Sequence, residues 1–231
     1  MAYLLALETS SNICSVALFQ DGQLLGISEL QMDKSHSSHI TMLVDQLLQN
    51  CQVPLTNLSA LLLSGGPGSY TGLRIGSSTA KGFCFSLDIP LIEVSTLKAL
   101  AAAAVSLTPR AAEYLFCPMI DARRMEVYTT LLGPDMKEVL PVCPMVLTEE
   151  SFEEQMRHNQ IIFFGSGAAK CKTLFGDNPN ALFLDNLTVS ARWLGKLGEE
   201  KYQNKLFEDV AYYEPFYLKE VYITSSNKTN K

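Results

Sequence analysis

GGPGSYTGLR, at residues 65–74, is the stretch that decides how the chain folds around it. Four glycines and one proline in ten residues do not fit the interior of a strand or a helix. The apolar run 60–63 before them predicts a buried strand, and the residues after them predict a helix that reaches about Leu87. A glycine-rich turn at a helix N-terminus either holds an anion on its backbone N–H groups or lets another backbone approach closely. The residues alone leave both interpretations open.

Two common phosphate-binding turns do not match this stretch. No Gly-Lys-Ser/Thr follows the glycines, which excludes a Walker loop. The spacing is also not Gly-x-Gly-x-x-Gly with an acidic residue on the next strand, which argues against a dinucleotide site.

Composition limits the possible class of protein. The 231 residues are 47% hydrophobic and 18% charged, enough for a large core in one or two domains. A net charge of −6 disfavours a chain that grips nucleic acid alone. The six cysteines include no Cys-x-x-Cys pair, so no zinc or redox motif is indicated. Without a leader-like start or a long apolar run, we expect a cytoplasmic protein that makes no membrane contact.

The first half of the chain reads as three strands, a helix, a strand, a helix, a strand and a helix. The strands are predicted at 4–7, 14–19, 24–30, 60–64 and 91–94, and Asp21-Gly22 predicts a hairpin turn. Three antiparallel strands followed by alternating helices and strands are typical of a ribonuclease H-like unit.

The second half loosely repeats this order from about Tyr114. Strands are predicted at 115–120, 125–132, 139–140, 145–147 and 161–164, with helices at 148–157, after the glycine turn at Gly165, and at 190–203. The prediction is therefore an α/β protein of two tandem ribonuclease H-like lobes, the actin-like ATPase architecture. We expect the lobes to span residues 1–108 and 109–231, with a polar tail from Ser225.

Four motifs in order carry a resemblance to a known family. Residues 7–10 read LETS, 66–74 read GPGSYTGLR, 120–128 read IDARRMEVY, and 214–219 read EPFYLK. Together they resemble the TsaB family, the bacterial partner subunits in making threonylcarbamoyladenosine in tRNA. Two positions depart from the family pattern, because Glu8 replaces the usual Asp and Lys219 replaces the usual Arg.

The resemblance implies a scaffold without catalysis of its own. Members of this family pair with the related transferase TsaD, and a P-loop ATPase, TsaE, completes the cycle; tRNA is reached only through the complex. TsaD holds a metal with a His-x-x-x-His helix after the strand that corresponds to 91–94. Here that helix begins STLKAL at residue 95 and has no histidine, so we expect no metal and no cofactor bound by this chain alone.

The resemblance also implies a partner surface on the first two helices of the first lobe. We expect the outer faces of 40–50 and 72–87 to form a homodimer patch that TsaD can also occupy. The helix at 72–87 has small residues at four-residue spacing, which allow another helix to approach closely. The predicted interface residues are His36, Ile40, Leu43, Leu47, Gly72, Arg74, Gly76 and Ala80.

The remaining singled-out residues are expected to be structural. Glu8 and Thr9 are expected to cap backbone at the entrance between the lobes, and Gly66 and Gly68 to shape the glycine turn. Arg74 opposes the helix dipole and needs a partner such as Glu8, Asp121 or a bound anion. Asp121, Arg123 and Glu126 are expected to form a salt-bridge network between the lobes. His36 and His39 lack a third ligand and do not indicate a metal site.

Two rival functions stay open at this stage. An actin-like small-molecule kinase needs a catalytic Asp and two phosphate-binding turns, and we find neither in the sequence. A peptidase acting on the partner subunit needs an activated Ser or Cys near a His, and no such arrangement stands out. The sequence also leaves open whether the glycine turn holds nucleotide at an interface with a partner.

Overall fold

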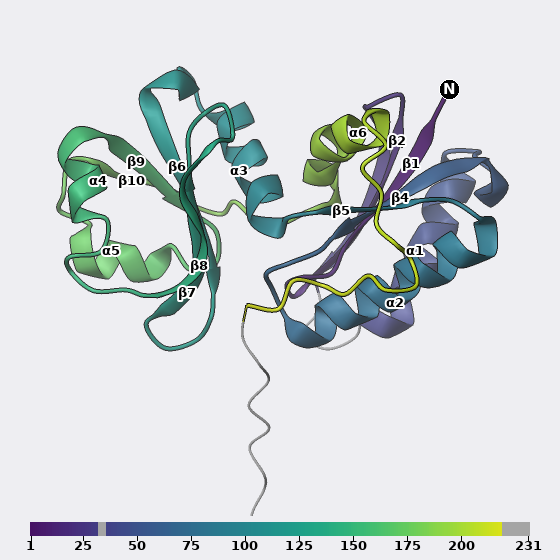
Figure 1. The fold of residues 1–231 in the computed structure, drawn as a ribbon, viewed down its shortest axis with the longest axis horizontal. Helices are drawn as coiled ribbons and strands as arrows, with labels where there is room; N and C mark the ends of the chain where they lie inside the picture. The colour runs from purple at the N-terminus through teal and green to yellow at the C-terminus, as the bar shows by residue number, and fades with distance from the viewer. Residues whose placement is uncertain (32–35, 219–231) are drawn as a thin grey trace, which may run out of the picture.

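The computed structural model describes residues 1–31 and 36–218, with the side chains of 36–38 left out, and it forms two α/β lobes (Figure 1). Lys219 and the tail from Ser225 lie outside the described residues. The first sheet has the strand order β3-β2-β1-β4-β5 and the second β8-β7-β6-β9-β10. The strands are β1 (Tyr3–Glu8), β2 (Ile13–Gln20), β3 (Gln23–Gln31), β4 (Leu58–Ser64), β5 (Leu91–Val94), β6 (Tyr114–Asp121), β7 (Glu126–Leu132), β8 (Glu138–Val146), β9 (Gln160–Phe164) and β10 (Ala181–Leu184).

Both sheets place their first strand in the middle. β1 pairs antiparallel with β2 and parallel with β4, and β6 pairs in the same way with β7 and β9. The predicted hairpin turn joins β2 to β3, where Asp21 and Gly22 both have positive φ, as a tight two-residue hairpin requires. The two sheets therefore share one topology, and the predicted α/β fold of two ribonuclease H-like lobes is confirmed.

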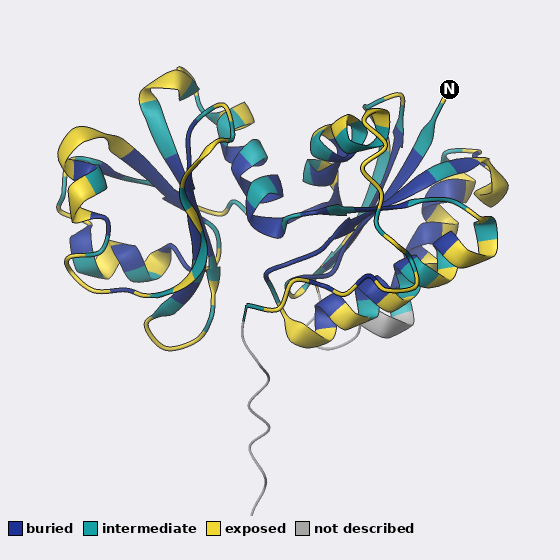
Figure 2. Cartoon of the chain, in the orientation of Figure 1, coloured by how far each residue is buried: buried dark blue, intermediate teal, exposed yellow. Residues whose placement is uncertain are grey.

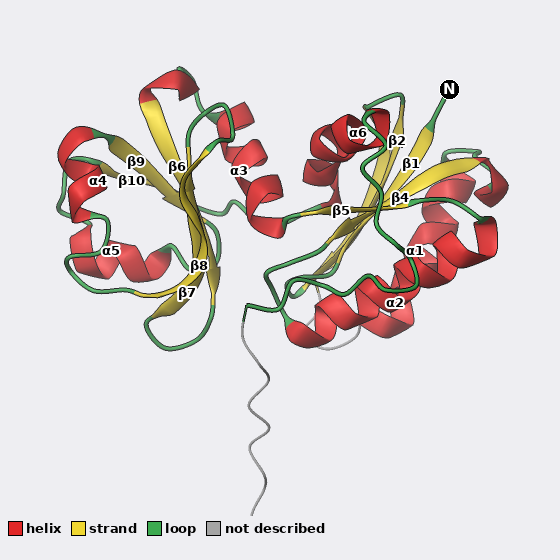
Figure 3. Ribbon diagram, in the orientation of Figure 1, coloured by secondary structure: helices red, strands yellow, loops and turns green. Residues whose placement is uncertain are grey.

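Helices cover the sheets unequally, as Figure 3 shows. α1 and α2 pack on one face of the first sheet and enclose its larger apolar cluster. Ser69 caps the start of α2 by accepting a hydrogen bond from the Gly72 N–H, and Ser95 caps α3 in the same manner. The helices are α1 (His36–Asn50), α2 (Tyr70–Leu87), α3 (Thr96–Leu107), α4 (Glu153–His158), α5 (Ala169–Phe175) and α6 (Gly195–Gln203), with short 3₁₀ turns η1 (Leu55–Asn57), η2 (Ala111–Glu113) and η3 (Ala191–Leu194).

Two local predictions in the second half are wrong. The helix predicted from Thr148 begins only at Glu153, because Thr148 and Ser151 close a turn between themselves through two hydrogen bonds. The two short strands predicted at 139–140 and 145–147 form one strand, β8, which contains two prolines. β8 tolerates them because it lies at the edge of its sheet.

The helix α3 lies between the two lobes and contributes to both cores. Its Ala99 packs with the first sheet, while Leu100 and Ala104 pack with Phe116 and Phe164 of the second. In Figure 2 the first turns of α3 are drawn mostly in dark blue, which marks this burial. Small side chains on the helix let it approach both layers closely.

The expected extent of the second lobe, 109–231, is wrong. After β10 the chain returns to the first lobe, where Ala191 and Leu194 of η3 pack with Leu4 and Leu62 on the face opposite α1 and α2. In α6, Gly198 lies so close to Leu62 that a side chain there would overlap it. The second lobe therefore consists of β6 to β10 with α4 and α5, and the first lobe is built from both ends of the described chain.

Candidate functional site

Three backbone donors of the glycine turn after β4 are bonded to other parts of the same chain. The N–H of Gly65 donates to the carbonyl of Val94, and the N–H of Gly66 donates to the hydroxyl of Thr96 at 3.1 Å. The N–H of Ser69 donates to the carbonyl of Ser10 at 2.7 Å. Since these donors are already paired, they cannot also cradle a phosphate.

The same turn leaves no space beside its glycines. A Cβ atom at Gly68 would overlap Ser10, and one at Gly72 would overlap the backbone carbonyl of Thr9. A Cβ atom at Gly76 would overlap the Thr9 hydroxyl. Of the two interpretations that the residues left open, close approach by another backbone is the one that the structure supports.

Glu8 and Thr9 lie beneath this turn at the end of β1, and both are buried. A Glu8 carboxylate oxygen accepts the N–H of Ser10, and the Thr9 hydroxyl donates to the carbonyl of Gly72 at 2.8 Å. Burial raises the pKa of Glu8 above 4.5, against hydrogen bonds from Ser10 and Ser64 that lower it. Glu8 and Thr9 therefore bond to backbone within the first lobe.

Arg74 finds a partner other than those predicted. Its guanidinium donates to the Tyr70 hydroxyl at 3.1 Å and lies 5.5 Å from the centre of that ring. Tyr70 in turn packs against Tyr217, with ring centres 5.1 Å apart. The expectation of a bond to Glu8 or Asp121 is wrong, because Arg74 lies on the exposed outer side of α2, whereas Glu8 lies buried behind it.

The carboxylate of Asp121, at the end of β6, is paired within the second lobe. The Asp121 carboxylate accepts the ammonium of Lys170 at 2.9 Å and the backbone N–H of Arg123. The same ammonium donates to the carbonyl of Glu126 at 2.7 Å. The expectation that Asp121 bridges the two lobes is therefore wrong, since Lys170 on α5 is a nearer partner in the same lobe.

Most of the predicted interface residues face inward. Those of α1 pack into the core of the first lobe, and the small residues of α2 pack against β1 and β4, so their assignment to the outer faces is wrong. His36 begins α1, but its side chain is outside the described part of the chain. The buried residues are Ile40, Leu43, Leu47, Gly72, Gly76 and Ala80.

The outer side of α2 is instead formed by a second row of residues. Positions 70, 74 and 78 are offset by two residues from 72, 76 and 80, which turns them about 200° around the helix. They surround a shallow hollow of about 450 Å³. We call this surface the α2 outer face; it consists of Tyr70, Thr71, Arg74, Ile75, Ser78 and Thr79.

A large apolar side chain extends the exposed side of α2. Phe85, near the end of the helix, is 87% exposed, and Met42 on the neighbouring α1 is also exposed. Sequence reasoning missed these residues. The available signal was that Phe85 does not fall in the row of small residues on the same helix. Aromatic residues are enriched among the residues that dominate binding between proteins.

A second, smaller hollow lies where the strand ends of the two lobes face each other. Its volume is about 220 Å³, and it is lined by Ser10 from the first lobe and Gly165 and Asn186 from the second, among others. Pockets that bury a drug-sized ligand usually measure about 300–1,000 Å³. This hollow is therefore too small for a nucleotide in the described arrangement of the lobes.

Two further properties hold for the described residues. Within residues 1–31 and 36–218, no group of three or more His, Cys, Asp or Glu side chains could hold a metal ion. In the same part of the chain, no helix has the length and apolar character needed to cross a bilayer.

Comparison with known proteins gives consistent matches over most of the chain. The family model for TsaD, tRNA N6-adenosine threonylcarbamoyltransferase, matches residues 22–213. The chain is 32% identical over 225 residues to the tRNA threonylcarbamoyladenosine biosynthesis protein TsaB of Haemophilus influenzae, covering 94% of this chain and 93% of that protein. It is 33% identical over 179 residues to TsaB of Bacillus subtilis, covering 75% of each.

A solved structure matches nearly the whole fold. It is an uncharacterized protein from Pseudomonas aeruginosa described as similar to the peptidase YeaZ, and it superposes with a TM-score of 0.83 at 26% identity. The match covers 95% of this chain and 100% of that one.

Proposed function

The chain belongs to the TsaB family, whose members act in tRNA threonylcarbamoyladenosine biosynthesis, and from this we propose that it is a non-catalytic scaffold that binds and stabilises a TsaD-like transferase. On its own the chain forms a homodimer through the surface that binds the TsaD-like subunit. A TsaE-like ATPase joins the complex, and tRNA is reached only through it. With that role we expect the protein in the cytoplasm.

The closed glycine turn is the observation that carries this proposal. In an actin-like enzyme, the loops at the strand ends must leave room for phosphate and its metal. Here the carbonyls of Thr9 and Ser10 occupy the space beside Gly72 and Gly68, and the N–H groups of Gly65, Gly66 and Ser69 are already paired. The first lobe therefore keeps the shape of an enzyme lobe while its own backbone fills the place where phosphate would bind.

The α2 outer face supports the binding role. It contains the exposed Tyr70–Arg74 pair, and the exposed Phe85 lies further along the same helix. Aromatic residues and arginine dominate the energetics of protein interfaces. The face lies on a helix held rigidly by close packing at Gly72 and Gly76, so little order has to be gained on binding.

One substitution pair tests this surface. Thr71→Glu places a charge on the α2 outer face, and Thr173→Glu places the same charge on the exposed side of α5 in the second lobe. We expect Thr71→Glu to weaken binding to the TsaD-like subunit at least about tenfold, or about 1.4 kcal/mol, measured by light scattering after size exclusion and by titration calorimetry. We expect Thr173→Glu to bind like the unchanged chain.

Equal binding by both variants would remove the α2 outer face from the proposal. The scaffold role itself is tested separately, by reconstituting tRNA modification with and without this chain. Full modification by the TsaD-like and TsaE-like proteins alone would overturn it, whichever surface they use.

The rival functions make different predictions. A small-molecule kinase would turn over ATP as the isolated chain, which the purified protein can be assayed for directly. A cysteine peptidase needs a thiol with a lowered pKa, whereas burial raises the pKa of Cys84 and Cys171 to about 12 and that of Cys14 to about 11. Cleavage of the TsaD-like subunit during prolonged incubation would nevertheless revive the peptidase.

A further inference from the structure

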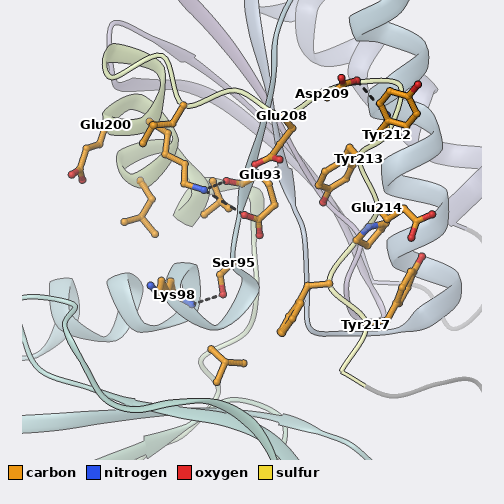
Figure 4. Close-up of a pocket in the computed structure, with 18 of the residues that line it drawn as sticks. Glu93, Ser95, Lys98, Glu200, Glu208, Asp209, Tyr212, Tyr213, Glu214 and Tyr217 are labelled. Carbon is orange, nitrogen blue, oxygen red and sulfur yellow. Dashed lines mark hydrogen bonds and ion pairs between the residues drawn. The ribbon is translucent and has the colours of Figure 1, made fainter.

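A large hollow lies on the first lobe, next to the α2 outer face. It is a groove of about 1,080 Å³ between α6, the junction of β5 with α3, and the segment 205–217. We call this segment the C-terminal strap. Figure 4 shows the strap residues and Glu93 facing one another across the groove.

The walls of the groove are held in place by the chain itself. The N–H of Glu208 donates to the carbonyl of Leu91 at 2.9 Å, and the N–H of Phe216 donates to the carbonyl of Gly65 at 2.8 Å. Between these points, the ammonium of Lys81 on α2 donates to the carbonyl of Ala211 at 3.1 Å. The groove is therefore preformed, and a ligand would not have to order it.

The groove has more negative than positive charges. Its two lysines are both engaged: Lys98 pairs with Glu138 at 2.9 Å, and Lys201 pairs with the Glu93 carboxylate at 3.4 Å. Within the described part of the chain, three further glutamates of the lining have no ion pair, and Asp209 bonds only to backbone N–H groups. These glutamates are Glu200, Glu208 and Glu214.

A buried hydroxyl in the groove also lacks a partner. Tyr213 is only 9% exposed, and among the described residues its hydroxyl makes no hydrogen bond. Burial raises the pKa of Tyr213, and the nearby carboxylates of Glu93 and Glu208 raise it further. A buried polar group of this kind is costly unless something bonds to it. A cationic donor bound between the two carboxylates would give the phenol oxygen its missing hydrogen bond.

Exposed aromatic rings form the rim of the groove. Tyr212 is 84% exposed, and Phe216 and Tyr217 are also exposed. Aromatic faces attract ammonium and guanidinium groups, and they pack against the alkyl stems that carry them. Carboxylates and aromatic rings that line the same groove are therefore suited to lysine or arginine side chains.

We propose that this groove binds a lysine- or arginine-bearing segment of a partner protein. The acidic lining repels nucleic acid backbones. The volume is at the upper end for single small ligands, which favours several residues of an extended segment over a free amine. The groove is a second docking surface. It adjoins the α2 outer face where Tyr217 packs against Tyr70, but its carboxylates lie on other elements, and it does not depend on what that face binds.

The test uses the full chain and a fluorescein-labelled eight-residue peptide in which lysine alternates with serine. The first variant carries Glu200→Gln, Glu208→Gln and Glu214→Gln. Its control carries Glu149→Gln, Glu150→Gln and Glu154→Gln, which change the net charge equally on an exposed part of the second lobe. By fluorescence anisotropy, we expect the groove variant to bind the peptide at least about tenfold more weakly, and the control less than about twofold.

Two further readouts locate the site. Carbodiimide coupling followed by mass spectrometry should join the peptide amines to Glu208 or Glu214 rather than to carboxylates of the second lobe. Tyr212→Ala, on the exposed rim, should weaken binding about threefold without affecting folding, since its ring lies largely in solvent.

Several outcomes would overturn the proposal. Equal loss of binding in both triple variants would mean that only net charge matters. Coupling confined to the second lobe would place the peptide elsewhere. Spermidine that saturates the groove while the peptide fails to bind would assign the site to a free polyamine instead.

Discussion

The two sheets have the same strand order, yet the turns that follow their fourth strands lead to different structures. After β4, the glycine turn leads into α2, a helix of 18 residues, whereas the equivalent turn after β9 leads into α5, which has seven. Figure 3 shows the difference in the helices that flank the two sheets. The long helix is the part of the first lobe that offers a broad outer surface to other molecules.

The two glycine turns are also packed differently. In the first lobe, the backbone carbonyl of Thr9 fills the space beside Gly72, and this carbonyl cannot shift unless the end of β1 shifts with it. In the second lobe, the side chains of Val127 and Met119 fill most of the space beside Gly167. The second turn is closed by backbone as well, at Gly165, which lies against the carbonyl of Met119. The difference therefore concerns Gly72 and Gly167, the glycines nearest the helix starts, and it can be measured.

The largest effect is expected from Gly72→Ala. The new methyl group would overlap the carbonyl of Thr9, so we expect the free energy of unfolding to fall by about 3 kcal/mol in urea denaturation. Gly82→Ala on the same helix has nothing within 4 Å and should raise stability by about 0.5–1 kcal/mol.

Gly167→Ala should have an intermediate cost of about 1 kcal/mol, since side chains can shift where backbone cannot. If Gly72→Ala and Gly167→Ala cost the same, the proposed difference between the two turns does not exist.

The next effect concerns pH and Glu8, the buried acid of the first lobe. Because burial raises the pKa of Glu8, the folded state retains a proton that the unfolded state releases. The free energy of unfolding should therefore fall as pH rises from 4.5 through the folded-state pKa, by at most about 1.4 kcal/mol per pH unit. In Glu8→Gln this part of the slope should vanish, measured by urea denaturation at several pH values.

The exposed Glu149→Gln serves as the matched control for Glu8 and should keep the slope of the unchanged chain. The acid at the same place in the second lobe is Asp121, which ends β6 as Glu8 ends β1. Unlike Glu8, Asp121 is exposed and paired with Lys170. If the slope is unchanged in Glu8→Gln, the pKa of Glu8 is the same in the folded and unfolded states, which contradicts the prediction.

The smallest effects distinguish the ion pairs within and between lobes. Lys170 is 16% exposed and bonds to both Asp121 and the carbonyl of Glu126, so Lys170→Met should cost about 1.5 kcal/mol. The pair between Lys98 and Glu138 joins the two lobes and is more exposed, so Lys98→Met should cost about 0.5 kcal/mol. Thermal unfolding of the two variants compares them directly, and the reverse order would contradict this ranking.

Much of the fold was predictable because its signals are local. Strands with apolar runs and the Asp21-Gly22 hairpin are each decided by a few neighbouring residues. The late start of α4 was missed because Thr148 and Ser151 form a turn of their own, although both residues suit a helix start.

The candidate site was harder to predict, because its inner and outer sides depend on distant contacts. A stripe of small residues on α2 fits either a partner or the protein's own core, and Thr9, 63 residues before Gly72, decides for the core. The path of the chain after β10 likewise depends on packing against Leu62, which no local pattern encodes. The spacing of Gly195 and Gly198 was the available signal for that close packing.

The return of the C-terminal part to the first lobe has a consequence for synthesis on the ribosome. One face of the first sheet, with Leu4, Leu62 and Ile92, is covered by η3 and α6, which are translated after all the strands of the second lobe. Until they emerge, this apolar face stays open while the second lobe is already complete. The nascent chain therefore passes through a stage in which its earliest strands need shielding from other chains.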